Sequence, residues 1–356
     1  MALTHVAVAA RPATDRGPRR GRRARSAVVA LTAAVTLVAA GCGSDESSDE
    51  SSVSTSAAGC STGSESGTRT ISDTHFGDVE VPAHPQRIVA GWLVGNQLID
   101  LGVPLAGLLD DYQQNASQAE LDKVKDLPTV GSIADGLSAE KALSLKPDLV
   151  VTSIRQDVVE TLAVDKLKEQ VPVAAFDIKE PADVWRNYPK VADAVGCGDK
   201  VTADLKRLDT DLEQVGIDNK EAISTLGEVA YVEGSAVPGS FQIATSKALT
   251  YERLTKAGLT YFSGADPNPE RYNQAVSLEL TSKLEPANVI FYEADFDGKP
   301  TKRTQELLDK TTFKNLPAVK AGNLFPYPAP YAYTITAADM QVEAITSAVK
   351  AAKPAQ

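Results

Sequence analysis

The feature that most constrains this 356-residue chain is a regular alternation of short apolar runs with amphipathic stretches. The apolar runs have the length of buried strands, and the stretches between them have helical spacing. Such alternation predicts an α/β fold with largely parallel sheets. A strand pair is expected at 70–71 and 79–81. The strands and helices expected after it are 87–90, 96–101, 105–109, 139–145, 148–152, 158–170 and 173–176, and then, in a second series, 228–232, 249–257, 278–284, 289–292 and 323–326.

The first forty residues have the composition of an export leader. Seven arginines from Arg11 to Arg25 precede an apolar run from Ala27 to Ala40, which Gly41 and Cys42 follow. This order resembles the leader of bacterial lipoproteins. The resemblance implies a signal peptide at 1–41 and a lipid such as palmitate on Cys42, which would anchor the protein to the extracytoplasmic face of the cell membrane. An ordinary secretory signal cut near Ala40 stays open, as does Sec or Tat export.

The segment after Cys42 is polar and rich in serine, aspartate and glutamate. Residues 42–67 contain almost no large apolar side chain, so we expect a disordered tether there. Loss of residues 1–41 removes seven arginines and one aspartate, and the net charge changes from −11 to −17. Nucleic acid is therefore an unlikely partner, and a neutral or cationic ligand suits the acidic surface.

The cysteines and histidines bound the chemistry of the mature chain. An extracytoplasmic location permits a disulfide between Cys60 and Cys197, and the sequence leaves this pairing open. Only His75 and His84 follow the leader, and there is no CxxC motif. We therefore expect no metal held by protein side chains.

A pattern in the first half of the chain recurs in the second half. Ser138-Ala139-Glu140 precedes a short helix, Pro147 and a buried strand, and Ser277-Leu278-Glu279 precedes the same series at the same spacing, ending at Pro286. The serines have the position of helix N-caps and the glutamates fall in the first turn. The glutamates either only complement the helix dipoles or have a function shared by two related lobes.

Together with Arg87-Ile88-Val89, Leu101-Gly102-Val103 and residues 316–322, this repeat makes the chain resemble a family over roughly residues 70–350. The family comprises the binding proteins of bacterial ABC importers for iron-siderophores, haem and cobalamin. The resemblance implies two Rossmann-like lobes joined by one long helix, a monomer, and a binding protein that is not an enzyme. It also implies that Glu140 and Glu279 dock onto arginines of the membrane permease.

The helical spacing of apolar residues between Val201 and Val215 supplies that long helix. We therefore predict an N-terminal lobe at 68–197, a linking helix at 198–218 and a C-terminal lobe at 219–356. A mature chain above 300 residues is also large enough for two cores.

Ligands of open α/β sheets bind beyond the carboxyl ends of the strands, so two facing lobes predict a cleft between them. Aromatic or arginine side chains near strand ends are the candidates for ligand contact. Each aromatic one could instead be a core residue, and Arg155 could instead pair with Asp157. Arg253, Arg271 and Arg303 have less positional support, and Tyr331 and Tyr333 either line the cleft or alternate faces. The candidates are Trp92, Tyr112, Arg155, Trp185, Tyr231, Phe241, Tyr272 and Tyr292.

The resemblance and the charge favour a ferric siderophore of the hydroxamate type as the ligand. A chelated iron needs no protein ligand, so no cofactor is expected, and an arginine can hydrogen-bond the chelating oxygens. A haem or cobalamin binding protein of the same family stays as the alternative. A surface hydrolase is disfavoured because the chain has no Gly-x-Ser-x-Gly elbow.

Overall fold

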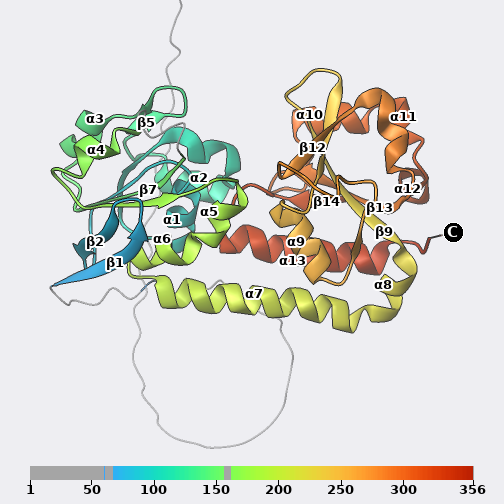
Figure 1. Cartoon of the computed structure of the whole chain (residues 1–356), viewed down its shortest axis with the longest axis horizontal. Coiled ribbons are helices and arrows are strands. Elements are labelled where there is room, and N and C mark those ends of the chain that lie inside the picture. The colour runs from blue at the N-terminus through green and yellow to red at the C-terminus, as the bar shows by residue number, and fades with distance from the viewer. Residues whose placement is uncertain (1–59, 61–66, 156–161, 356) are drawn as a thin grey trace, which may run out of the picture. The chain divides into compact units, whose positions relative to one another are not determined.

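The computed structural model describes Cys60, residues 67–155 and residues 162–355. Figure 1 shows two α/β lobes above one long helix, α7 (Gly198–Asp218). This helix has the bounds predicted for the linking helix. The leader, Cys42, most of the tether and the first part of the helix expected at 158–170 lie outside the described residues. No helix in the described ranges is long and apolar enough to cross a lipid bilayer.

The N-lobe is built on a parallel sheet of order β4-β3-β7-β8. Side chains of alternate residues enter two different cores, as the period of two in a strand requires. Val151 of β7 packs with the core on the α1 and α6 side, whereas Val150 packs with the core on the α3 and α4 side. Both faces are therefore covered, which explains the continuous apolar runs of these strands. The strands are β3 (Ile88–Ala90), β4 (Leu105–Leu108), β7 (Leu149–Ile154) and β8 (Val173–Asp177).

Short elements complete this lobe. The predicted strand pair forms an antiparallel hairpin, and Gly102 ends the first helix with a φ of 69°, as the sequence predicts. The helix expected at 158–170 is described only as the one-turn α4. The remaining elements are β1 (Thr68–Thr74), β2 (Gly77–Pro82), α1 (Gly95–Leu101), η1 (Asp110–Asn115), α2 (Gln118–Val124), β5 (Gly131–Ser132), β6 (Gly136–Leu137), α3 (Ala139–Ser144), α4 (Val164–Leu167), α5 (Ala182–Arg186) and α6 (Tyr188–Ala194).

The C-lobe sheet has the order β12-β10-β9-β13-β14, with β11 beside β9. The strands β9, β11, β13 and β14 are parallel, whereas β10 and β12 are antiparallel to their neighbours. The sheet is therefore mixed, because β9 turns directly into β10 without a crossover helix. Its strands are β9 (Glu228–Gly234), β10 (Ser240–Ala244), β11 (Thr260–Tyr261), β12 (Asn273–Ser277), β13 (Ala287–Ala294) and β14 (Leu324–Pro328).

The helices of the C-lobe pack around a single core. The repeat predicted from sequence is visible here, since Ser138 caps α3 and Ser277 caps the element that follows β12. The second copy is a kinked 3-10 helix rather than an α-helix. The helical elements are α8 (Lys220–Leu226), α9 (Leu249–Lys256), η3 (Leu278–Leu284), α10 (Lys302–Leu308), α11 (Thr311–Lys314), α12 (Pro317–Ala321) and α13 (Ile335–Ala351).

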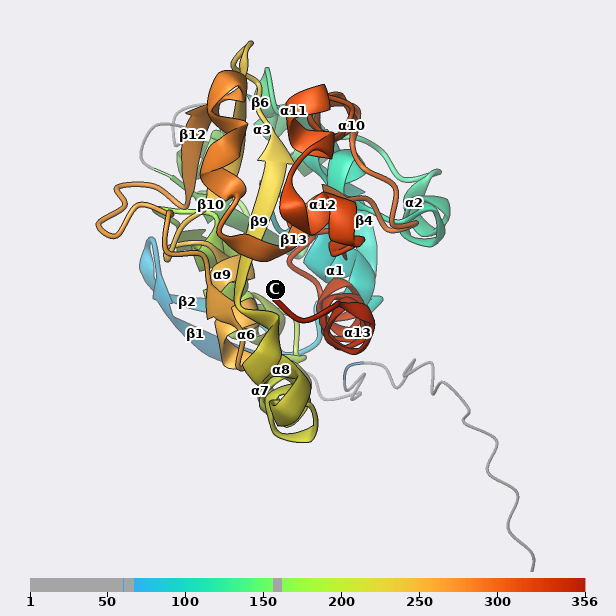
Figure 2. The same ribbon diagram turned by 90° about the vertical axis from the view of Figure 1, so that its right-hand side faces the viewer.

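The last helix, α13, connects both lobes rather than belonging to the C-lobe alone. It contacts β14 and α8 on the C-lobe side, α1 on the N-lobe side, and α7 along its length. Figures 1 and 2 show it lying between α7 and the lobes. The boundary predicted for the C-terminal lobe therefore needs a correction, because the chain returns to the N-lobe after β14.

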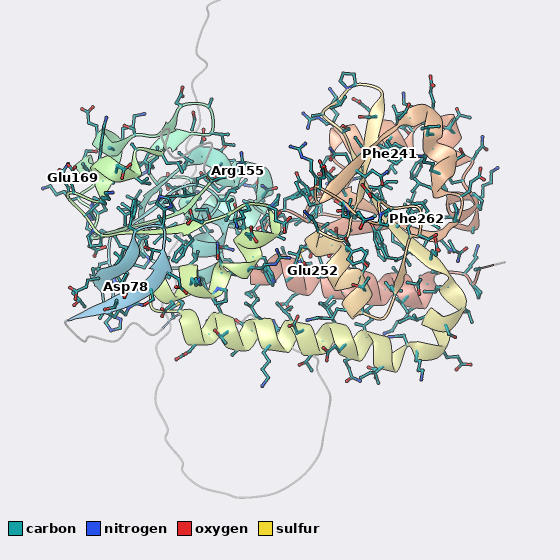
Figure 3. All side chains as sticks on the ribbon, in the orientation of Figure 1. Asp78, Arg155, Glu169, Phe241, Glu252 and Phe262 are labelled. Atoms are coloured by element: carbon teal, nitrogen blue, oxygen red, sulfur yellow. A yellow bond between two sulfur atoms is a disulfide. The ribbon has the colours of Figure 1, made fainter. Side chains whose placement is uncertain are left out.

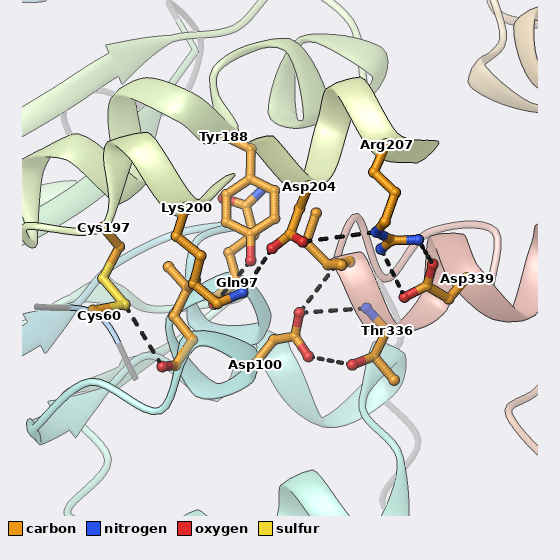
Figure 4. A network of polar contacts seen from close by, with 12 residues as sticks. Cys60, Gln97, Asp100, Tyr188, Cys197, Lys200, Asp204, Arg207, Thr336 and Asp339 are labelled. Atoms are coloured by element: carbon orange, nitrogen blue, oxygen red, sulfur yellow. Dashed lines mark hydrogen bonds and ion pairs between the residues drawn. A yellow bond between two sulfur atoms is a disulfide. The ribbon is translucent and has the colours of Figure 1, made fainter. Parts of the chain in front are cut away.

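A polar network fixes the start of α13 (Figure 4). Asp100 of α1 accepts hydrogen bonds from the backbone N–H of Ile335 at 3.0 Å and from the hydroxyl of Thr336 at 2.5 Å. Arg207 of α7 forms an ion pair with Asp339 of α13 at 2.8 Å. The linking helix and the N-lobe thus hold the same two turns of α13.

The structure joins Cys60 and Cys197 in a disulfide with a Cα–Cα distance of 4.8 Å. Cys197 is the residue that immediately precedes α7. The bond therefore ties a point of the N-terminal segment to the start of the linking helix.

Candidate ligand-binding cleft

A cleft of about 660 Å³ lies between the lobes. This is within the usual range for small-molecule sites. The N-lobe contributes loops that follow β3, β7 and β8, and the C-lobe contributes residues from β13, from α10 and from the segment that follows β14. The lining residues are Leu93, Asn115, Arg155, Ile178, Lys179, Glu180, Pro181, Val184, Gly234, Tyr272, Glu293, Thr301, Lys302, Arg303, Tyr331 and Tyr333.

Arg155 directly follows β7 and lies on the N-lobe wall of the cleft, towards the C-lobe in Figure 3. Its guanidinium carbon is 5.2 Å from the centroid of the Trp92 ring, a distance typical of a cation–π contact. The Trp92 ring therefore helps to hold the Arg155 side chain in place. The partner considered from sequence, Asp157, lies outside the described residues.

Leu93 lines the same wall in a left-handed conformation, with a φ of 56°. This backbone conformation is unfavourable for leucine, so a specific contact has to stabilise it. The Leu93 N–H donates to the Asp111 carboxylate at 2.5 Å, and Trp92 N–H donates to Thr152 at 3.0 Å. Burial raises the pKa of the Asp111 carboxyl to about 7. Asp111 is thus a buried support for the wall.

The C-lobe wall combines acidic and basic side chains. One oxygen of Glu293 accepts hydrogen bonds from the hydroxyls of Thr301 at 2.8 Å and Thr304 at 2.6 Å. Lys302 and Arg303, at the start of α10, are exposed on the same wall. The wall therefore offers both acceptors and donors to a ligand.

The floor is the segment between β14 and α13, which carries Tyr331 and Tyr333. Ala329 and Tyr333 both have positive φ values, of 43° and 52°. Gln97 of the N-lobe donates to the Tyr333 carbonyl at 3.2 Å, which holds the turn from the other lobe. Both tyrosines line the cleft.

A buried carboxyl group lies beside this floor. Glu233, at the end of β9, is 5% exposed and accepts hydrogen bonds from the Tyr331 hydroxyl at 2.5 Å and the Tyr231 hydroxyl at 3.1 Å. Burial is the largest influence on this group and raises its pKa to about 7. The proximity of Glu293 raises the pKa of Glu233 further.

The structure brings some of the predicted site residues to the cleft and others nearby. Arg155 and Tyr272 line it, Trp92 supports Arg155, and Tyr231 bonds to Glu233. Trp185 lies at the junction of the lobes, with its ring 4.4 Å from the guanidinium carbon of Arg253. Trp185 therefore contacts the other lobe and packs against cleft-lining residues such as Tyr333, but it does not line the cleft itself.

Three predicted residues do not reach the cleft. Tyr112 is buried in the N-lobe core, because η1 turns its ring inward against α1. Phe241 is completely buried in the C-lobe core, within the lobe in Figure 3. Tyr292 packs against the outside of that core, since its neighbour Glu293 takes the cleft-facing position of β13. Among the less favoured arginines, Arg303 lines the cleft and Arg253 is buried.

The sequence interpretation missed the acidic residues of the cleft. Glu233 and Glu293 lie near the carboxyl ends of the buried strands β9 and β13, where ligand contacts are expected, but the prediction was restricted to aromatic and arginine residues. The signal was present in the chain, since each glutamate lies one or two positions after a tyrosine already chosen. The loop from Ile178 to Pro181, which follows β8, has the same position and was also missed.

Glu140 and Glu279 are exposed at the first turns of α3 and η3. Neither lines the cleft. Ser138 accepts a backbone hydrogen bond from Lys141 and Ser277 accepts one from Glu279, so both copies of the repeat begin with a serine cap although the helices differ.

Neither His75 nor His84 lines the cleft; His75 instead contacts Asp177 at 2.8 Å. Within the described ranges, no three His, Cys, Asp or Glu side chains are grouped so that they could hold a metal ion.

A family model for periplasmic binding proteins matches residues 101–331, which is more than half of the chain. The chain belongs to the periplasmic binding protein family. Members of this family are substrate-binding proteins and not enzymes, so the cleft of this periplasmic binding protein serves capture rather than catalysis.

Known proteins similar to this periplasmic binding protein cover most of its length. The iron(3+)-hydroxamate-binding protein YxeB of Bacillus subtilis is 24% identical over 76% of this chain and 82% of its own length. The probable siderophore-binding lipoprotein YfiY of Bacillus subtilis is 26% identical over 81% of this chain and 85% of its own. The siderophore periplasmic binding protein from the fuscachelin gene cluster of Thermobifida fusca superimposes with a TM-score of 0.69, at 25% identity over 76% of this chain and 98% of its own.

Proposed function

We propose that this periplasmic binding protein captures a ferric siderophore of the hydroxamate type and delivers it to an ABC importer. The observation that carries the proposal is the two-walled cleft of about 660 Å³ with Arg155 on one side and Tyr272 on the other. The name of YxeB supports a ferric hydroxamate, and the names of YfiY and of the Thermobifida protein support a siderophore.

The side chains of the cleft suit a ferric hydroxamate better than a free ion. A hydroxamate chelate presents a ring of oxygens around the metal, and an arginine donates to such oxygens through two parallel N–H groups. The iron is carried by the siderophore, so the protein needs no cofactor of its own.

The rest of the proposal concerns the membrane. We propose that Cys42 carries a lipid and anchors a monomer to the extracytoplasmic face of the cell membrane. We also propose that Glu140 and Glu279 dock onto arginines of the permease. Their exposure, their matching positions after the capping serines of the two lobes and their absence from the cleft lining support this role.

Fluorescence titration of the wild type with ferrioxamine tests the ligand. We expect saturable quenching that depends on Trp92, because this ring contacts Arg155. Arg155→Ala should weaken binding by about 1–3 kcal/mol, the range for a hydrogen bond to a charged group. Arg155→Lys should bind more tightly than Arg155→Ala, because lysine keeps the positive charge but lacks the two parallel N–H groups of the guanidinium.

Haem, cobalamin, a ferric catecholate and the iron-free chelator serve as comparison ligands in the same titration. Tighter binding of haem or cobalamin than of the ferric hydroxamate would replace the proposed ligand by that compound. Unchanged affinity in a folded Arg155→Ala variant would remove Arg155 from the site.

A further inference from the structure

A small side cavity opens beside the floor of the cleft. Its volume is about 20 Å³, enough for one group of the size of a water molecule or an ammonium ion. Pro181, Tyr272, Tyr331 and Tyr333 line both this side cavity and the main cleft. A ligand in the cleft can therefore extend a short arm into it.

Four tyrosines and one carboxyl group line the side cavity, together with Pro181, Pro330, Thr250, Asn273 and apolar side chains. Tyr231, Tyr272, Tyr331 and Tyr333 line it together with Glu233. The faces of aromatic rings carry negative electrostatic potential and attract cations, most strongly where water is excluded. An aromatic cage with one carboxylate is therefore suited to a positively charged group.

The hydrogen bonds around Glu233 strengthen this preference. The Tyr231 and Tyr331 hydroxyls donate to one carboxylate oxygen, and the Asn273 amide is 3.4 Å from the other oxygen. Because both phenol protons point at Glu233, the phenol oxygens keep only lone pairs for a ligand. The cage thus presents acceptors to a group that donates several hydrogen bonds.

We propose that this cage, formed by Glu233 with Tyr231, Tyr272, Tyr331 and Tyr333, binds a primary ammonium group at the end of an arm of the siderophore. The inference rests on the proposed function and narrows its ligand to ferric hydroxamates with a free terminal amine. A primary ammonium has three N–H donors and fits the available volume, whereas a guanidinium or a trimethylammonium group is too large.

The electrostatics of the ligand-free cage agree with this assignment. Burial raises the pKa of Glu233 to about 7, since a carboxylate without a positive partner is unstable in such a site. An ammonium group would supply the missing partner.

The experiment compares two ferric trihydroxamate chelates that differ only at the terminal nitrogen, which is a free amine in one and acetylated in the other. Acetylation removes the charge and enlarges the group. We expect the wild type to bind the free-amine chelate at least about 10-fold more tightly than the acetylated chelate, which is the effect of a charged hydrogen bond in a buried site. Equal affinity for the two chelates would overturn the inference.

The variant Glu233→Gln keeps the shape of the side chain and removes its charge. In this variant we expect the affinity for the free-amine chelate to fall to that for the acetylated chelate, and the affinity for the acetylated chelate to stay unchanged. Glu285→Gln, an exposed carboxylate of the same lobe, is the matched control and should keep the wild-type preference. A preserved preference in Glu233→Gln would assign the discrimination to another group and overturn the inference.

The outcomes separate the inference from the function on which it rests. If both chelates bind equally well, the protein still captures ferric hydroxamates and only the ammonium cage is wrong. If neither chelate binds the wild type, the proposed function fails as well. Since the first comparison needs only the wild type, it decides the matter even where Glu233→Gln does not fold.

Discussion

At the scale of single residues, buried carboxyl groups shape the cleft from behind. Asp111 holds the backbone of Leu93, and Glu233 holds the hydroxyls of Tyr231 and Tyr331. Each carboxyl group loses hydration on folding and has its pKa raised to about 7 for that reason. The geometry of the cleft therefore depends on groups that destabilise the folded protein when they are ionised.

This cost gives Asp111 a defined effect on stability. Its pKa is about 7 in the folded protein and 3.8 ordinarily, so its contribution to stability is complete below pH 3.8 and is lost as the pH rises to about 7. The loss is on the order of 4 kcal/mol. In Asp111→Asn this part of the decline in the free energy of unfolding should disappear, as measured by urea denaturation between pH 4 and pH 8.

The exposed Asp126→Asn variant is the control and should follow the wild-type pH profile. If the stability of Asp111→Asn depends on pH as that of the wild type does, the pKa of Asp111 does not differ between the folded and the unfolded protein.

The position of Arg155 directly after a strand could be predicted from the sequence, and Tyr272 was predicted because it precedes the repeat helix. The direction of a side chain could not be predicted. Tyr292 and Glu293 are adjacent, and a period of two sends them to different surroundings. Phe241 and Tyr112 satisfied the same rule of position, but an aromatic ring gains more from a core than from a wet cleft.

At the scale of elements, α13 is a second connection between the lobes. Its first turn carries its own cap, Thr334, and also receives Asp100 from the N-lobe. A carboxylate at a helix N-terminus is stabilised by the helix dipole and by the free N–H groups. A second cap therefore comes from the other lobe and couples the floor of the cleft to α1.

We expect Asp100→Ala to lower the free energy of unfolding by about 1–2 kcal/mol, the range for loss of a helix cap. The amides of Ile335 and Thr336 should exchange with solvent faster, as measured by hydrogen–deuterium exchange. Asp100→Asn keeps a hydrogen-bond acceptor, so its free energy of unfolding should fall less than that of Asp100→Ala.

Asp309→Ala removes an exposed ion pair with Lys314 and should have little effect. Unchanged exchange at Ile335 in Asp100→Ala would show that Thr334 caps the helix alone.

The sequence predicted α7 because apolar residues recur in it at helical spacing over several turns. It did not indicate the role of α13, because contacts such as Asp100 with Thr336 join residues far apart in the chain. The 3-10 form of η3 was equally invisible, since the repeat has the same Ser, Glu and Pro signals in both lobes. Local signals predict where an element begins, and tertiary packing decides its geometry.

At the scale of the whole molecule, the proposed function assigns capture and delivery to different residues. The cleft residues lie between the lobes, whereas Glu140 and Glu279 are exposed and absent from its lining. In the Glu140→Arg, Glu279→Arg double variant we expect normal affinity for ferric hydroxamate and a collapse of iron uptake in cells. Placing like charges against the proposed permease arginines can cost several kcal/mol.

Labelling of cells with palmitate tests the anchor. Cys42→Ala should lose incorporation of labelled palmitate, while Lys353→Ala, an exposed change near the other terminus, should keep it. Wild-type uptake by the double variant would leave both glutamates as helix-terminal charges only. Equal labelling of Cys42→Ala would place the lipid elsewhere.

The disulfide between Cys60 and Cys197 also sets a length. If Cys42 carries the proposed lipid, the chain between the membrane and the disulfide runs from residue 42 to residue 60. These are about 18 residues, which span at most roughly 60 Å. Without the bond the first fixed point is Thr68, and the limit becomes roughly 90 Å over about 26 residues. The volume that the body can sweep is then about threefold larger, and its effective concentration at the permease falls by the same factor.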